Sequence, residues 1–106
     1  MTDAVLMKIA DDFINATISR LSSGSCEMVN LYFVDLRAVF SDRQRITQNL
    51  IENAIRVFDS RGLGVAVNGP TLNVTVDLNR CYLSHQQSLD FSTALTHARV
   101  VLGCNI

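Results

Sequence analysis

The fold of this chain is decided by residues 63–78, which read LGVAVNGPTLNVTVDL. On both sides of the central NGPT stretch, apolar side chains alternate with small or polar ones. A period of two residues is typical of a half-buried β-strand, and Asn-Gly and Gly-Pro pairs mark turns. The sequence therefore predicts a β-hairpin with one face in the core. That face consists of Leu63, Val65, Val67, Leu72, Val74, Val76 and Leu78.

The other face of this predicted hairpin is small and nearly uncharged. It consists of Gly64, Ala66, Asn68, Asn73, Thr75 and Asp77. Lysines or other charges normally protect an exposed strand against pairing with another chain, and this face has almost none. Either a helix of the same chain covers the face, or another chain does. For the second case we predict that the partner-binding residues are Ala66, Asn73, Thr75 and Asp77.

Three further segments have the spacing of amphipathic helices. The first covers residues 3–21, and its buried stripe consists of Leu6, Ile9, Ala10, Phe13, Thr17 and Leu21. The second begins at the capping box Ser41-Asp42-Arg43-Gln44 and ends at Arg61-Gly62. The third begins at the capping box Ser84-His85-Gln86-Gln87 and ends at Gly103. Its stripe consists of Phe91, Ala94, Leu95, Ala98 and Leu102.

Residues 28–40 allow two interpretations. Tyr32, Phe33 and Val34 favour a strand, whereas Val29, Phe33, Leu36 and Phe40 lie at helical spacing. We favour the strand, because a hairpin alone is marginally stable and a third strand completes a viable sheet. The predicted order is then helix, strand, helix, strand, strand, helix. We expect an α+β two-layer domain, with the helices packed on one face of a small antiparallel sheet.

Length and composition exclude several classes of protein. The 106 residues correspond to one domain, residues 1–106. Apolar residues make up 48% and charged residues 18%, which excludes a disordered chain. Polar residues interrupt every apolar run well before the length of a membrane span, so we expect none. The net charge of −1 gives no overall attraction to nucleic acid or anionic lipid.

The three cysteines, Cys26, Cys81 and Cys104, are odd in number and far apart in the sequence. Charged residues interrupt the N-terminal stretch that an export signal would require to be apolar. We therefore expect a cytoplasmic protein, located in the host cytoplasm if a phage encodes it. In a reducing compartment all three thiols should be free and mostly buried.

Candidate metal ligands cluster near the C-terminus, at Cys81, His85, His97 and Cys104. Their spacing matches no common zinc framework. If both histidines lie on the last helix, twelve residues separate them by about 18 Å along its axis, too far for one ion. The sequence thus predicts no metal, and it indicates no other cofactor or small-molecule ligand.

Catalysis has one candidate pair of neighbouring residues, Cys81 and His85. A thiol nucleophile needs a base held within hydrogen-bond reach, and this is the only pair of such residues that lie near each other in the sequence. However, the chain contains no nucleophile elbow, no phosphate-binding glycine loop and no paired-carboxylate motif. The sequence therefore predicts a protein that is not an enzyme.

Nucleic-acid binding is the alternative function, through the helix that starts at Ser41. This helix contains residue types that contact bases or phosphates, namely Arg43, Arg45, Gln48, Asn49 and Arg56. Acidic residues at positions 52 and 59 share the exposed face and cancel its positive charge. We consider a mixed, solvated helix face the better interpretation.

The leading functional hypothesis is a non-catalytic protein–protein interaction module. A one-domain chain that has no active-site motif can still act by binding another molecule through a complementary surface. We expect the partner to be a protein or a second copy of the chain in a homodimer. Small accessory proteins of phages and mobile elements, including inhibitors of host nucleases, are a class of protein that acts in this way.

Overall fold

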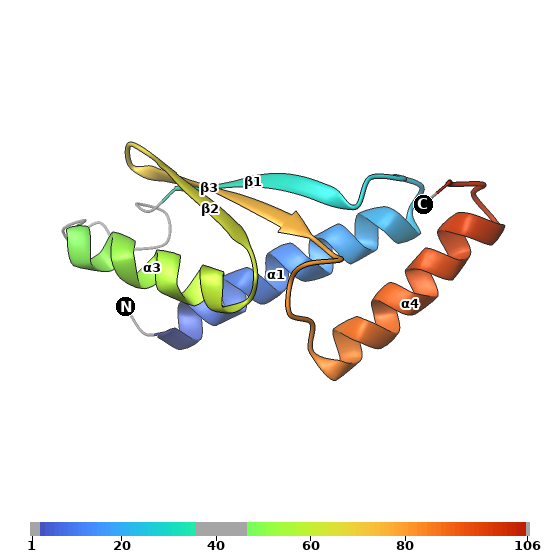
Figure 1. Ribbon diagram of the computed structural model, residues 1–106, viewed down its shortest axis with the longest axis horizontal. Coiled ribbons are helices and arrows are strands. Elements are labelled where there is room, and N and C mark those ends of the chain that lie inside the picture. Colours follow the sequence, from blue (N-terminus) through green and yellow to red (C-terminus); the bar gives the residue numbers. More distant parts are fainter. Residues whose placement is uncertain (1–2, 36–46, 106) are drawn as a thin grey trace.

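The computed structural model describes residues 3–35 and 47–105 (Figure 1). Within them it has three helices and a three-stranded antiparallel sheet. In chain order these are α1 (Asp3–Ser22), β1 (Val29–Asp35), α3 (Gln48–Ser60), β2 (Gly64–Asn68), β3 (Thr71–Asp77) and α4 (His85–Val100). The predicted α+β class and the predicted order of elements are therefore confirmed.

The sheet has the order β1-β3-β2, with β3 in the centre. β2 and β3 form the predicted hairpin, in which Val65 pairs with Val74. β1 lies antiparallel to the other side of β3, and its Tyr32 pairs with the same Val74. The strand prediction for residues 28–40 is confirmed over Val29–Asp35, and positions 36–40 lie outside the described residues.

The core lies between one face of the sheet and helices α1 and α3, while α4 packs beside α1 (Figure 1). Leu72, Val74 and Val76 on β3 are fully buried against this layer, as is Phe58 of α3. These β3 residues belong to the face that the alternating pattern predicted. Burial of several large apolar side chains, at about 1.5–3 kcal/mol each, holds the layers together.

β1 is anchored on α1 by its inward-facing side chains. The Tyr32 ring stacks on Phe13 with the ring centroids 4.7 Å apart, and its hydroxyl lies 3.2 Å from Thr17 Oγ1. Arg20 of α1 donates a hydrogen bond of 2.8 Å to Asn30 Oδ1. Because successive side chains of a strand alternate in direction, these contacts turn the side chains of Val29, Leu31 and Phe33 to the opposite face.

Two residues predicted to lie in the core are exposed in the structure. Val67 is 51% exposed because it stands on an edge strand, beside the hairpin turn. Leu102 is 40% exposed because α4 ends at Val100. The remaining predicted stripe of α4 faces α1, with Ala94 and Ala98 fully buried.

The helix predicted from Ser41 does not run unbroken to Arg61. α3 begins at Gln48, and Thr47 is its N-cap with an extended backbone (φ −106°, ψ 162°) and an Oγ1 that accepts from Leu50 N. The predicted capping box at Ser41–Gln44 lies outside the described residues. The second predicted box is confirmed, since Ser84 and Gln87 cap each other reciprocally at the start of α4.

The prediction of three free thiols is wrong for two of them. Cys26 and Cys104 form a disulfide with their Cα atoms 5.5 Å apart. Sequence separation hid this pair, because α4 packs parallel to α1 and the end of α4 therefore lies beside the end of α1 (Figure 1). Cys81 is free and buried, as predicted. The disulfide contradicts the expectation that a reducing compartment keeps all three thiols free.

Candidate protein-interaction face

The candidate site is the face of the sheet that points away from the helices, which we call the outer face. It consists of Val29, Leu31, Phe33 and Asp35 on β1, Thr71, Asn73, Thr75 and Asp77 on β3, and Gly64, Ala66 and Asn68 on β2. In the described part of the chain, α1, α3 and α4 all lie on the other side of the sheet (Figure 1).

Two cross-strand rows form the centre of the outer face. Phe33, Asn73 and Ala66 make one row, and Leu31, Thr75 and Gly64 make the next. Neither row contains a charged residue. The carboxylates of Asp35 and Asp77 lie at opposite ends of the face, beside Thr71 and Val29 respectively. An uncharged centre with charges at the rim is the usual anatomy of a protein interface.

Three large apolar side chains of β1 are exposed on this face. Val29 is 51%, Leu31 52% and Phe33 66% exposed. Together they form a continuous apolar stripe along one edge strand. Single exposed apolar residues are common, but a contiguous stripe rimmed by polar groups marks an interaction site.

The relief of the outer face is asymmetric. The large side chains of the β1 stripe project from the sheet, whereas β2 contributes only Gly64 and Ala66 to the same two rows. A Cβ atom at Gly64 would lie 3.3 Å from Thr75 Cβ, so the absence of a side chain there keeps this side low. The face therefore has a ridge along β1 and a shallow trough along β2.

Asn73, at the middle of the ridge and trough, has an unsatisfied side chain. Its Oδ1 atom is buried and accepts no hydrogen bond from any described residue. An acceptor left in this state costs about 1–3 kcal/mol relative to a paired one. A partner on the outer face would recover that energy only if the Asn73 side chain turned its Oδ1 outward to accept from it.

The structure brings together all four predicted partner-binding residues, Ala66, Asn73, Thr75 and Asp77, on the outer face. Sequence reasoning missed the three large members of the site, Val29, Leu31 and Phe33. Both faces of β1 are largely apolar, so the pattern did not show which side chains point outward. The alternation with Asn30 and Tyr32, which need polar partners, was the available signal.

The residues predicted for the alternative function are partly outside the described residues, because Arg43 and Arg45 belong to positions 36–46. Gln48 and Asn49 are exposed in the first turn of α3. Arg56 is bound within the chain, where its Nη2 lies 2.9 Å from Asp3 Oδ2 and contacts Asn53 Oδ1. The Arg56 guanidinium holds the pKa of Asp3 below its ordinary value.

The thiol of Cys81 is not set up as a nucleophile. Burial raises its pKa, which disfavours the reactive thiolate. No hydrogen bond joins it to His85 in the described structure. Cys104 is disulfide-bonded, so its sulfur is not a free metal ligand. Residues 3–35 and 47–105 contain no group of three His, Cys, Asp or Glu side chains placed to hold a metal.

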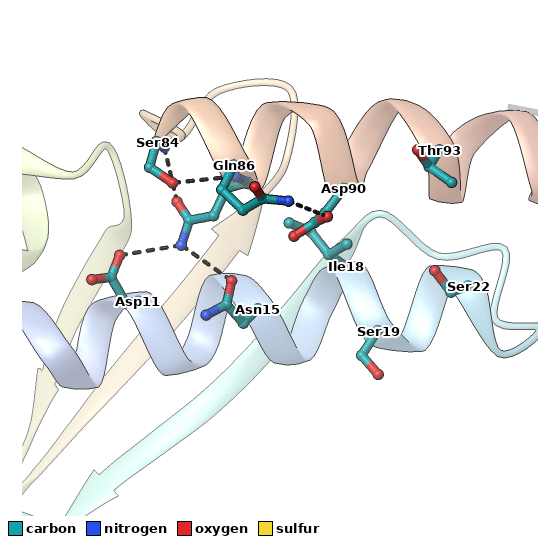
Figure 2. Close-up of a pocket in the computed structure, with 10 residues that line it drawn as sticks. Asp11, Asn15, Ile18, Ser19, Ser22, Ser84, Gln86, Asp90 and Thr93 are labelled. Carbon is teal, nitrogen blue, oxygen red and sulfur yellow. Dashed lines mark hydrogen bonds between the residues drawn. The ribbon is translucent and has the colours of Figure 1, made fainter.

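A groove of about 620 Å³ lies between α1 and α4, where Asp11 and Asn15 face Ser84 and Asp90 (Figure 2). Its polar groups are used within the chain. Buried Gln87 donates to Asp11 and Asn15 and accepts from Arg61 Nη2 at 3.0 Å. Arg61 Nη1 also lies 2.6 Å from Asp11 Oδ1. This network joins the helices, so the groove is a structural feature.

Fold and site define a small single α+β domain, and none of its described helices covers the outer face of the sheet. Comparisons with protein-family models, with curated proteins and with solved structures find no match to this chain. Its described helices include none with the length and apolar character needed to cross a membrane.

Proposed function

We propose that this protein is a non-catalytic protein-interaction module that binds another protein chain through its outer face. The observation that carries the proposal is the pair of uncharged central rows, next to an apolar stripe that is half or more exposed. Burial of this stripe by a partner is favourable by about 25 cal/mol per Å² of apolar surface.

The charges of the outer face favour a protein over a nucleic acid as the partner. Its described residues include two carboxylates and no Lys or Arg. Nucleic-acid affinity depends on cations that neutralise phosphates, and this face supplies none. Binding through α3 is the alternative, but the Arg56 charge is already engaged by Asp3.

A crosslinking comparison tests the proposal. The purified chain, alone and in an extract of the cells that make it, is crosslinked as wild type and as Thr75→Lys. Thr93→Lys is the matched control, because Thr93 is exposed on α4, away from the sheet. We expect a protein product, with itself or with another chain, that Thr93→Lys retains and Thr75→Lys loses. Identical products from both variants would overturn the proposal.

The alternative function has its own measurement. Binding to random duplex DNA is measured at physiological salt, where an arginine-dependent interface would show a steep loss of affinity with rising salt. We expect no such binding. Micromolar binding that Arg56→Ala abolishes would favour the alternative.

A further inference from the structure

We infer that the occupant of the outer face is a second copy of this chain, packed face to face about a two-fold axis that runs along β3. This inference rests on the proposed function and specifies its partner. A two-fold homodimer requires a surface that is complementary to itself. The shape and the polar groups of the outer face both meet that requirement.

The first argument is the ridge and trough. A two-fold axis along β3 exchanges the positions of β1 and β2, since these strands flank β3 on opposite sides. Phe33 then lies over Ala66 of the second copy, and Leu31 lies over its Gly64. Large side chains meet small ones in both central rows. A two-fold axis across the strands would instead place β1 on β1 and β2 on β2, so that ridge meets ridge and the trough stays empty.

The second argument is the amide of Asn73. With the axis along β3, Asn73 meets Asn73 of the second copy. A side-chain amide has both donors and an acceptor, so it is complementary to itself. Because Oδ1 of Asn73 is buried within the single chain, an amide pair across the axis requires this side chain to turn its Oδ1 toward the second copy. Thr75 also lies on the axis, with a hydroxyl that both donates and accepts.

The charges of the face permit this arrangement. The central rows bring no charge toward the second copy. Asp77 also lies on the axis, opposite Asp77 of the second copy, and each carboxylate is bound within its own chain, to Asn79 N at 3.0 Å and Arg80 Nε at 3.7 Å.

Size indicates a weak dimer. Strand rise and spacing give the outer face about 23 by 14 Å, so two such faces cover only about 640 Å², below the roughly 1,000 Å² that a stable specific interface needs. The single chain also exposes 6354 Å², against about 5,900 Å² for a compact monomer of its mass. Its radius of gyration is 15.0 Å, against about 13 Å for a compact chain of this length. We expect micromolar self-association.

Cysteine crosslinking with a short bifunctional maleimide tests the axis. Phe33→Cys and Ala66→Cys should each give little dimer alone, and their mixture should give crosslinked dimer. Thr75→Cys, on the axis, should crosslink with itself. Wild type, whose Cys81 is buried, is the blank. Efficient crosslinking of Leu31→Cys with itself, together with an unreactive mixture, would overturn the axis along β3.

Sedimentation of the wild type separates this inference from the proposed function. A concentration-dependent dimer that Thr75→Lys converts to a monomer with an unchanged circular dichroism spectrum supports both. A strict monomer at high concentration overturns the inference. The proposed function still stands in that case if the crosslinked product that Thr75→Lys loses contains a different protein, and it falls if no such product forms.

Discussion

Cys26 and Cys104 lie 78 positions apart in the sequence and are joined by a disulfide that ties the end of α4 to the loop after α1. α4 contacts α1 and no strand extensively, so it is the most peripheral helix of the domain. Two attachments hold its ends. The Gln87 network holds its first turn, and the disulfide holds the segment that follows its last turn.

Reduction of this disulfide should destabilise the fold. A disulfide that closes a loop of this length is worth about 4–5 kcal/mol in the chain-entropy model, and removal from small domains costs about 2–5 kcal/mol. The Tm should therefore fall by about ten degrees or more in reductant. The double variant Cys26→Ser with Cys104→Ser should melt low and show no response to reductant. An unchanged Tm would support the opposite expectation, drawn from the sequence, of three free thiols.

Gln87 should be essential to the attachment of α4. Gln87→Ala leaves Arg61, whose side chain is 12% exposed, without one of its acceptors, and it removes the donor to Asp11 and Asn15. We expect a loss of about 1–3 kcal/mol in urea unfolding, since buried polar groups lose their partners. The control is Gln86→Ala, because Gln86 is exposed and bonds only Asp90 at the surface. Equal losses in the two variants would contradict this role.

The Arg56–Asp3 pair should make a small, pH-dependent contribution to stability. Because hydrogen bonds from Arg56 and Asn53 hold the folded-state pKa of Asp3 below its ordinary value of 3.8, the contribution is present above that value. It is lost as the pH falls through the lower, folded-state pKa. An NMR titration of the Asp3 carboxyl should show a higher pKa in Arg56→Gln than in wild type. A pKa that does not change in this variant would show that the pair does not persist in solution.

Phe33 should contribute to self-association and little to the stability of the single chain. Phe33→Ala removes the top of the ridge, and we expect the dimer Kd to rise about tenfold or more. Unfolding of the monomer should change by no more than about 0.5 kcal/mol, because the ring is 66% exposed. Tyr82→Ala is a matched control, since Tyr82 is also an aromatic residue and 66% exposed but lies outside the outer face. A Kd that changes equally in both variants would exclude the ridge as the contact.

Local sequence patterns predicted the elements of this fold because short-range physics determines them. Alternation over residues 63–78 gave both strands of the hairpin, and the capping box at Ser84 marked the start of α4 to the residue. The same alternation separated Asn73 and Thr75 from the buried Val74 and Val76. A residue's place on a face depends only on its neighbours in the strand.

Local sequence patterns did not predict the features that depend on which helices and strands pack together. Val29, Leu31 and Phe33 point outward because Tyr32 stacks on Phe13 and Asn30 bonds Arg20, contacts that exist only once α1 lies under the sheet. The described helices leave the outer face uncovered because α1 and α3 pack on the opposite face of the sheet and α4 packs on α1. That same packing brings Cys104 to Cys26. By itself, the sequence determined the elements and their amphipathic faces. Tertiary packing decided the disulfide and the exposed apolar stripe, because both depend on contacts between residues far apart in the chain.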